Sequence, residues 1–203
     1  MIKKKIGIYG GTFSPPHVGH VGAAESFSKA VMLDELLIMP DFLPPHKQID
    51  GVATPEQRLE MAKLAFGHIK NAKISDMEIK RGGRSYTSVT LEELSGEDRE
   101  LYFLCGTDMF VTLEEWYRPE VIFNLACICY VRRESDSKFD SITEQLEKKY
   151  KEKYGAKIIR IDSEVKEVSS SELRAALKDG SDNARILLSE SVYKYISEEG
   201  LYK

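Results

Sequence analysis

Short apolar runs alternate with longer amphipathic stretches along the whole chain. The apolar runs have the length of buried strands, and six of them predict a sheet: Ile6–Gly10, Glu35–Pro40, Ala72–Asp76, Arg99–Cys105, Ala126–Val131 and Lys157–Asp162. The stretches between them carry apolar residues at helical spacing. They predict helices over residues 20–33, 54–69, 85–94, 107–116, 141–154, 169–177 and 190–198, and a further short helix that begins at Arg118-Pro119. Residues 78–83 predict a polar connection.

Strands that alternate with helices in this way are typical of βαβ units with right-handed crossovers. We therefore expect an α/β fold, a Rossmann-like doubly wound parallel sheet with helices on both faces. Ligands of such sheets bind beyond the carboxyl ends of the strands. No linker, repeat or low-complexity segment divides residues 1–203, so one domain is expected.

The net charge of −4 disfavours a general nucleic-acid binder, which would need a basic surface. No apolar run reaches the ~20 residues of a membrane helix, and the basic start lacks the apolar stretch of a signal peptide. A cytoplasmic protein without a membrane partner is expected. Cys105, Cys127 and Cys129 lie in apolar runs and are expected to be reduced and buried, although Cys127 and Cys129 could also ligate a metal.

The first predicted strand ends in Gly10-Gly11 and leads through a proline-rich loop to His17 and His20. Glycines allow a ligand to approach the backbone, and the unpaired amides at a helix start attract phosphate. Two imidazoles spaced three residues apart can face one point and stabilise charge on a transferring phosphoryl group. The alternatives are a structural pair, with one solvated and one capping histidine, and a metal-binding pair.

The glycine spacing does not match the phosphate loop of kinases and GTPases, nor Gly-x-Gly-x-x-Gly. Instead, Gly10-Gly-Thr-Phe-Ser-Pro-Pro-His17-Val-Gly-His20 resembles the signature loop of bacterial nucleotidyltransferases, which join a nucleoside triphosphate to a phosphate monoester. These enzymes pair that loop with a late Ser-Ser-Thr-x-Ile-Arg motif. Val168-Ser-Ser-Ser-Glu-Leu-Arg174 is similar to it.

The second motif also has a local interpretation. Ser169 and Glu172 can form a capping box, which would make this segment a well-built helix start. Arg174, however, places a cation in the first turns of a helix, where the macrodipole disfavours it. A bound anion would remove this conflict, so we expect a site for the β- and γ-phosphates together with the cap.

Across nearly its whole length the chain resembles the bacterial nicotinate-nucleotide adenylyltransferase family. The similarity extends to Pro44-Pro-His-Lys47, Ser85-Tyr-Thr87, Gly106-Thr-Asp108, Trp116-Tyr117 and the Leu201-Tyr202 ending. The resemblance implies that His17 and His20 are catalytic. It implies nicotinate mononucleotide contacts from His46, Lys47, Thr87, Trp116 and Tyr117. It implies ATP contacts from Gly10, Gly11, Thr12, Phe13, Gly106, Asp108, Arg133, Ser169, Ser170, Ser171 and Arg174.

Some of these residues also have structural interpretations. Trp116 could be a core aromatic, Asp108 a helix cap and Lys47 an exposed loop lysine. The chain also departs from the family pattern. Ser14 and Val89 stand where the family usually has Asp, and Arg133 keeps only the arginine of an Arg-Pro-Gly segment.

The resemblance implies transfer of AMP from ATP to nicotinate mononucleotide, which gives nicotinate adenine dinucleotide and pyrophosphate in NAD biosynthesis. Mg²⁺ would be bound mainly through phosphate oxygens, without a protein-built metal site. A homo-oligomer is compatible with the sequence. The nearest alternative is a related transferase that uses nicotinamide mononucleotide, phosphopantetheine or a CTP-dependent substrate. The others are a fragment of a class I aminoacyl-tRNA synthetase and a non-catalytic nucleotide-binding regulator.

Overall fold

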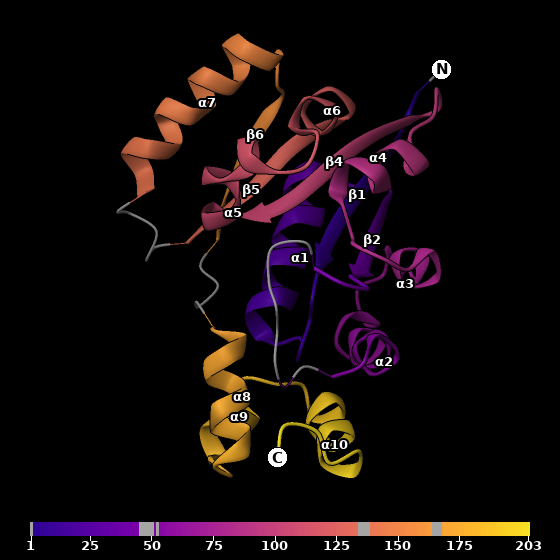
Figure 1. Cartoon of the computed structure of the whole chain (residues 1–203), viewed down its shortest axis with the longest axis vertical. Coiled ribbons are helices and arrows are strands. Elements are labelled where there is room, and N and C mark those ends of the chain that lie inside the picture. The colour runs from indigo at the N-terminus through magenta and orange to yellow at the C-terminus, as the bar shows by residue number, and fades with distance from the viewer. Residues whose placement is uncertain (1, 45–50, 52, 134–138, 164–167) are drawn as a thin grey trace.

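The computed structural model describes residues 2–44, 51, 53–133, 139–163 and 168–203. At its centre lies a six-stranded sheet in the order β3-β2-β1-β4-β5-β6 (Figure 1). All neighbouring strands are parallel. The strands are β1 (Lys4–Gly11), β2 (Glu35–Pro40), β3 (Ala72–Ile74), β4 (Arg99–Gly106), β5 (Ala126–Arg133) and β6 (Ile158–Ser163). The predicted fold class and all six predicted strands are confirmed.

The helices that connect the strands cover both faces of the sheet, and α8, α9 and α10 follow the last strand (Figure 1). They are α1 (Val18–Val31), α2 (Pro55–Phe66), α3 (Met77–Arg81), α4 (Thr87–Leu94), α5 (Thr107–Val111), α6 (Pro119–Leu125), α7 (Asp140–Tyr154), α8 (Ser170–Lys178), α9 (Asp182–Ile186) and α10 (Glu190–Glu198). One hydrophobic cluster packs α1, α2, α8 and α10 with sheet residues such as Leu104 and Cys129. The other packs α4, α5, α6 and α7 with Phe103 and Ile128. Adjacent residues of one strand thus face opposite clusters, as expected for a sheet that is buried on both faces.

Local sequence explains where α2 begins. Thr54 accepts a hydrogen bond from the Gln57 amide at 3.3 Å, and the Gln57 side chain accepts from the Thr54 amide at 3.0 Å. Pro55 occupies the first turn, where its missing N–H costs no helical bond. The predicted capping box is confirmed.

Two local predictions were wrong, and one short helix was missed. Residues 78–83 were expected to be a connection, but the segment forms α3, because Glu78 turns inward and accepts a hydrogen bond from Thr90 at 2.5 Å. The helix expected over residues 107–116 ends at Val111 and is followed by a 3₁₀ turn, Leu113–Glu115. The short helix α9 had not been predicted.

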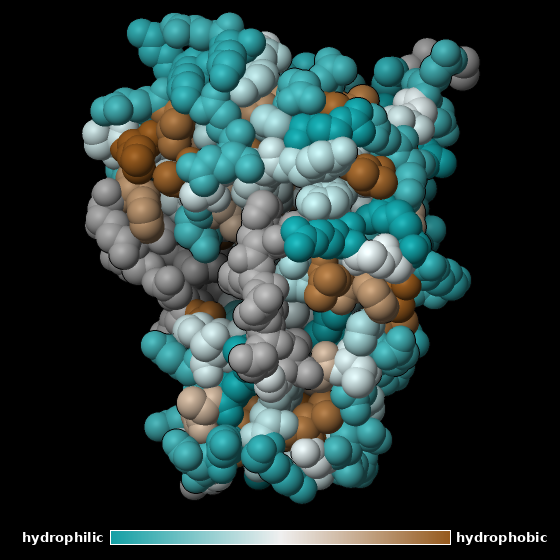
Figure 2. Space-filling view, viewed as in Figure 1, coloured by the Kyte–Doolittle hydropathy of each residue, from teal (hydrophilic) through white to brown (hydrophobic). Residues whose placement is uncertain are grey.

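The surface shown in Figure 2 is mostly hydrophilic, and small hydrophobic patches interrupt it, one of them near the start of α7, where Ile142 is exposed. Within the described ranges no helix combines the length and the apolar character needed to span a bilayer. The cysteines are free thiols, with Cys105 and Cys129 buried and Cys127 half-buried.

The strand order reverses between β1 and β4. The chain proceeds from β1 to β2 and β3 on one side and from β4 to β5 and β6 on the other. In sheets of this topology ligands bind beyond the carboxyl ends of the two strands at which the order reverses. The Gly10-Gly11 motif lies at the end of β1 and the Gly106-Thr-Asp108 motif begins at the end of β4, so both motifs lie at this edge of the sheet.

Candidate active site

His17 and His20 form a reciprocal cap at the start of α1. The amide of His20 donates to Nδ1 of His17 at 3.3 Å, and the amide of His17 donates to Nδ1 of His20 at 3.4 Å. The two rings stack with centroids 3.7 Å apart. This is an unusual capping box, because imidazoles take the places of the Ser/Thr and the Glu/Gln.

The reciprocal bonds determine the tautomer of both histidines. A ring nitrogen that accepts a hydrogen bond carries no proton, so each neutral ring has its proton on Nε2. Both rings can thus present an Nε2–H donor to an anion while Nδ1 holds the backbone. His17 is buried and His20 is half-buried. The two reciprocal hydrogen bonds show that both rings, and not one alone, take part in the cap.

The loop before the histidines is anchored by an aromatic side chain. Phe13 is 2% exposed. Its ring makes edge-on contacts with Tyr9 and Phe66, each at a centroid distance of 5.3 Å, and with His20 at 5.2 Å. The backbone at Phe13 is left-handed, with a φ of 48°. Packing of this ring supports the unusual backbone and orients the loop that follows β1.

Gly10 and Gly11 have different surroundings. A Cβ on Gly11 would lie 3.0 Å from the Phe13 ring, so this glycine makes room for the anchor. At Gly10 the nearest atom to a Cβ would be the Met39 carbonyl oxygen, 4.0 Å away. Packing within the described part of the chain therefore does not require glycine at position 10.

A buried ion pair that the sequence did not predict holds the backbone and side chain of Thr12 in this loop. Arg58 donates to Asp41 at 3.0 Å and to the Thr12 carbonyl at 2.9 Å, and it is 3% exposed. The Thr12 hydroxyl also donates to Asp41 at 2.8 Å. Arg58 stands on the apolar stripe of α2 together with Met61 and Ala65. A charged residue among the apolar positions of a helix was the signal in the sequence that could have indicated a buried ion pair.

The same cluster connects the histidine loop with the Ser85–Thr87 segment. Arg58 donates to the Phe42 carbonyl at 3.2 Å, and the Phe42 amide donates to the Ser85 hydroxyl at 2.9 Å. The Ser85 amide in turn donates to the Leu43 carbonyl at 3.0 Å. A continuous path of hydrogen bonds therefore runs from Thr12 to the start of α4.

The late motif begins α8, as its sequence predicts. Ser169 is the N-cap and accepts from the Glu172 amide at 3.3 Å, which is one half of the predicted capping box. Ser170 and Ser171 form the first turn, with Ser171 exposed. Arg174 donates to the Ser170 carbonyl at 3.3 Å and to the Ser171 hydroxyl at 3.2 Å, so its charge faces the open end of the helix.

Arg174 also brings the two motifs together. Its Nη1 donates to the Ser14 carbonyl at 3.0 Å, across 160 residues of sequence. The start of α8 thus lies against the loop that precedes the histidines. This arrangement combines imidazole, guanidinium and hydroxyl donors with the amides of two helix starts, a set suited to an extended polyphosphate.

The segments expected to hold the pyridine nucleotide are partly described. Thr87 is half-buried at the start of α4, and the exposed ring of Tyr117 lies 4.5 Å from the ring of Tyr86. Trp116 is half-buried and packs edge-on against Phe103 at 6.0 Å, so part of its surface belongs to the core. His46 and Lys47 lie outside the described residues.

The remaining predicted ATP contacts follow β4 and β5. Asp108 is the exposed second residue of α5, whose N-cap is Gly106, so it does not cap this helix as the alternative proposed. A Cβ on Gly106 would lie 2.6 Å from the Asp108 carboxylate, and glycine lets that carboxylate turn back toward the strand end. Arg133 is the last residue of β5, opposite Ser163 in β6.

Comparison with known proteins shows the family of this chain. Residues 8–176 match the sequence profile described as cytidylyltransferase-like. The chain belongs to this family of nucleotidyltransferases. A Listeria monocytogenes serotype 4b protein named "Probable nicotinate-nucleotide adenylyltransferase" is 34% identical, with 99% of this chain and 98% of the relative aligned. A protein of the same name from Lachnoclostridium phytofermentans is 37% identical, with 98% of this chain and 99% of the relative aligned.

Solved structures show the same fold. The Plasmodium falciparum nicotinic acid mononucleotide adenylyltransferase, described as complexed with NaAD, superimposes with a TM-score of 0.79 at 20% identity, over 98% of this chain and 97% of the other. A Vibrio parahaemolyticus protein described as a nicotinate-nucleotide adenylyltransferase superimposes with a TM-score of 0.67 at 22% identity, over 98% and 95% of the two chains.

Proposed function

We propose that this protein transfers AMP from ATP to nicotinate mononucleotide and releases pyrophosphate, as a nicotinate-nucleotide adenylyltransferase. The observation that carries the proposal is the contact of Arg174 with the Ser14 carbonyl, because it joins the two motifs that a nucleotidyltransferase needs. The relatives of that name, which align over almost the whole chain, support the choice of substrate.

The proposed reaction is a direct in-line displacement. A phosphate oxygen of the mononucleotide attacks the α-phosphorus of ATP, the bond to the β-phosphate oxygen breaks, and pyrophosphate leaves with that electron pair. Phosphoryl transfer of this kind chiefly requires positioning and charge stabilisation. His17 and His20 donate from Nε2 to the phosphate oxygens on which charge develops. Gly10, Gly11 and the amides of Thr12 and Phe13 border the same phosphates.

The leaving pyrophosphate is assigned to the start of α8. Ser169, Ser170, Ser171 and Arg174 supply hydroxyl, amide and guanidinium donors there, as an oxyanion requires. Gly106, Asp108 and Arg133 are assigned to the nucleoside part of ATP, with Asp108 as an acceptor for ribose hydroxyls. The nicotinate ring and its carboxylate are assigned to Trp116, Tyr117 and Thr87, and the mononucleotide phosphate to His46 and Lys47.

Mg²⁺ fits this site only as an ion carried by ATP. It prefers oxygen ligands, whereas the two side chains at the centre of the site are imidazoles. Within the described ranges no three His, Cys, Asp or Glu side chains come together as a metal site. Bound to phosphate oxygens and water, Mg²⁺ would neutralise charge on the triphosphate. A cytoplasmic location and a single-domain chain also remain our predictions from the sequence.

The test is pyrophosphate release from ATP and Mg²⁺ with each acceptor in turn. We expect release with nicotinate mononucleotide and at least tenfold less with nicotinamide mononucleotide or phosphopantetheine. Release that is fastest with one of these two acceptors would replace the assignment by the corresponding adenylyltransferase. ATP binding without release on any acceptor would favour a nucleotide-binding regulator.

A further inference from the structure

Ser14 lies at a junction between three distant parts of the chain. Its hydroxyl lies 2.8 Å from the Tyr202 hydroxyl, although the two residues are 188 positions apart. The same Ser14 oxygen accepts from the Ala53 amide at 3.3 Å, just before α2. Its carbonyl accepts from Arg174 of α8. Ser14 is 2% exposed, so these bonds are made away from bulk water.

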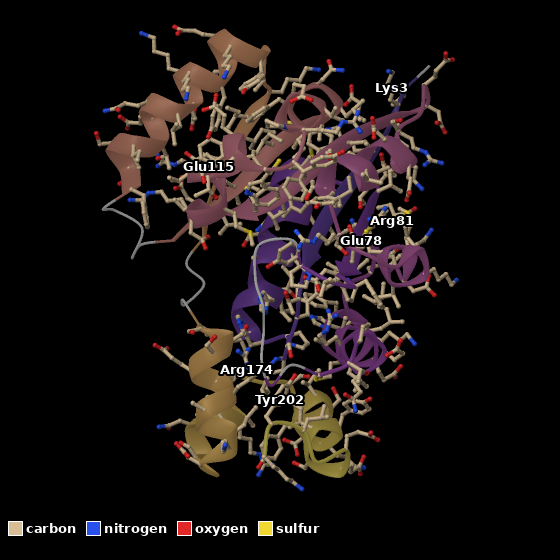
Figure 3. All side chains as sticks on the ribbon, viewed as in Figure 1. Lys3, Glu78, Arg81, Glu115, Arg174 and Tyr202 are labelled. Carbon is tan, nitrogen blue, oxygen red and sulfur yellow. The ribbon has the colours of Figure 1, made fainter. Side chains whose placement is uncertain are left out.

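Tyr202 reaches Ser14 because the chain turns back after α10. The Leu201 amide donates to the Ile196 carbonyl at 3.0 Å, and Gly200 and Tyr202 both have left-handed backbones with φ of 64° and 62°. This turn directs the phenol inward, between α8 and α10, where Figure 3 shows Tyr202 next to Arg174. Its hydroxyl also lies 4.0 Å from the sulfur of Met61.

The chemistry of this pair is that of two neutral hydroxyls. Burial raises the pKa of Tyr202 to about 12, so the phenol keeps its proton over the working range of most enzymes. A serine at position 14 can accept from Ala53 and still share one proton with this phenol. The bond between Ser14 and Tyr202 is therefore independent of pH near neutrality, unlike a bond to a carboxylate.

A displacement of Ser14 reaches His17 directly. Pro15 and Pro16 connect the two residues, and the fixed φ of proline makes this a stiff connection. His17 is the N-cap of α1, so movement of its backbone also changes the stacked His20 ring. Through the Ser14 carbonyl the same junction sets the distance between the histidines and Arg174.

We propose that Tyr202 is a positioning residue for the phosphoryl-transfer site. Its phenol holds Ser14, and through Ser14 it sets the place of the His17 and His20 rings relative to the start of α8. The proposal rests on the proposed function, in which His17 and His20 bind the reacting phosphates. It gives a side chain near the C-terminus, 188 positions from Ser14 in sequence, a role in turnover that mutation can test.

A double-mutant cycle on turnover tests this proposal. Tyr202→Phe and Ser14→Ala each remove one hydroxyl and keep most of the packing. We expect each to lower kcat about 10-fold, since small misplacements of reacting groups have large effects on rate. The KM values for both substrates should change less than about twofold, and the double variant should be no slower than the slower single variant. Independent, multiplicative losses in the double variant would overturn the proposal, as would an unchanged kcat in Tyr202→Phe.

Tyr195→Phe is the matched control, because it removes another phenol that packs against the same hydrophobic cluster, whereas the phenol that bonds Ser14 is that of Tyr202. It should leave kcat unchanged. Amide hydrogen exchange supplies a readout that does not need activity. Tyr202→Phe should accelerate exchange of residues 18–21 at least fivefold and leave β5 unchanged. Unchanged exchange at α1 in Tyr202→Phe would refute the positioning role, whether or not the wild type releases pyrophosphate. Absence of pyrophosphate release by the wild type would refute only the proposed function.

Discussion

The guanidinium of Arg58 lies 3.0 Å from the carboxylate of Asp41, and both groups are shielded from water beneath the histidine loop. This pair joins α2, the end of β2 and the backbone of Thr12. Removal of one partner leaves a buried charge without compensation, which is among the most destabilising single changes.

We therefore expect Arg58→Leu to lower the free energy of unfolding by about 3–5 kcal/mol. Urea denaturation followed by circular dichroism measures this change. Arg160→Leu is the matched control, because its ion pair with Asp162 is exposed and should contribute less than about 1 kcal/mol. Equal effects of the two substitutions would contradict the structural role given to the buried pair.

His17 has a capping role and a proposed catalytic role, and two substitutions separate them. Asparagine is a strong N-cap residue, so His17→Asn should keep the stability of α1, whereas His17→Ala should lose about 1 kcal/mol. Both variants should lose at least 100-fold in kcat, because neither presents Nε2–H to the phosphates. Thermal unfolding and pyrophosphate release measure the two effects.

His20→Ala should likewise reduce turnover by orders of magnitude. The surface residue His68, which pairs with Glu25, provides the control, and His68→Ala should retain full turnover. Turnover like that of wild type in His17→Asn or His20→Ala would contradict the assigned catalytic role.

Two glycines of β1 should respond differently to alanine. A Cβ at Gly7 would lie 2.3 Å from Leu33 and 2.9 Å from Phe27, so Gly7→Ala should destabilise the protein by about 1–3 kcal/mol. At Gly10 the nearest atom is 4.0 Å away, so Gly10→Ala should unfold like the wild type. Gly10→Ala should instead raise the KM for ATP at least fivefold, since its Cβ would occupy ligand space. An unchanged KM would remove Gly10 from the ATP site.

Glu78 gives a pH dependence of stability with a definite sign. Burial raises the pKa of Glu78 above 4.5, and the negative charge of Asp41 raises it further. Hydrogen bonds from Thr90 and Ser85 and the positive charge of Arg81 lower this pKa, but their effect is smaller than that of burial. The folded state therefore binds a proton that the unfolded state has lost, and stability due to this group falls as pH rises from 4.5 through the folded pKa.

Glu78→Gln removes this titration and keeps an oxygen that accepts from Thr90. The difference in unfolding free energy between Glu78→Gln and wild type should increase with pH above 4.5 and then level off. Denaturation at a series of pH values measures it. Glu93→Gln, on the exposed side of Arg81, is the control and should show no such rise. A difference that stays constant with pH would contradict the buried, proton-binding carboxylate (Glu78 and Arg81 are labelled in Figure 3).

The cysteines should differ in reactivity. Burial raises the pKa of the Cys105 thiol, and the hydrogen bond with Cys127 together with burial raises the pKa of Cys129. Only Cys127 is partly accessible. Iodoacetamide at pH 8 should therefore label one thiol of the native protein and all three in urea, as intact mass shows. Cys127→Ser should abolish labelling of the native protein. Labelling that persists in this variant would show that another thiol is accessible.

The sequence by itself determined the parts of this protein that depend on neighbouring residues. Hydrophobic runs predicted every strand, and Thr54, Pro55 and Gln57 predicted the start of α2, because such signals act within one turn of chain. The glycine and histidine loop and the Ser169–Arg174 segment were recognisable for the same reason. Their sequences carry the helix caps and donors within a few positions.

Only the tertiary structure decided what connects these parts. Arg58 and Asp41, Glu78 and Thr90, and Ser14 and Tyr202 are pairs of residues whose hydrogen bonds cross between elements. The apolar stripe of α2 marks Arg58 as a residue that could be buried, but nothing in the local sequence assigns it Asp41 as a partner. Nor does the local sequence assign Ser14 a partner 188 residues away. The free energy of such a bond depends on which groups folding removes from water together. That is set by the packing of the sheet and its helices.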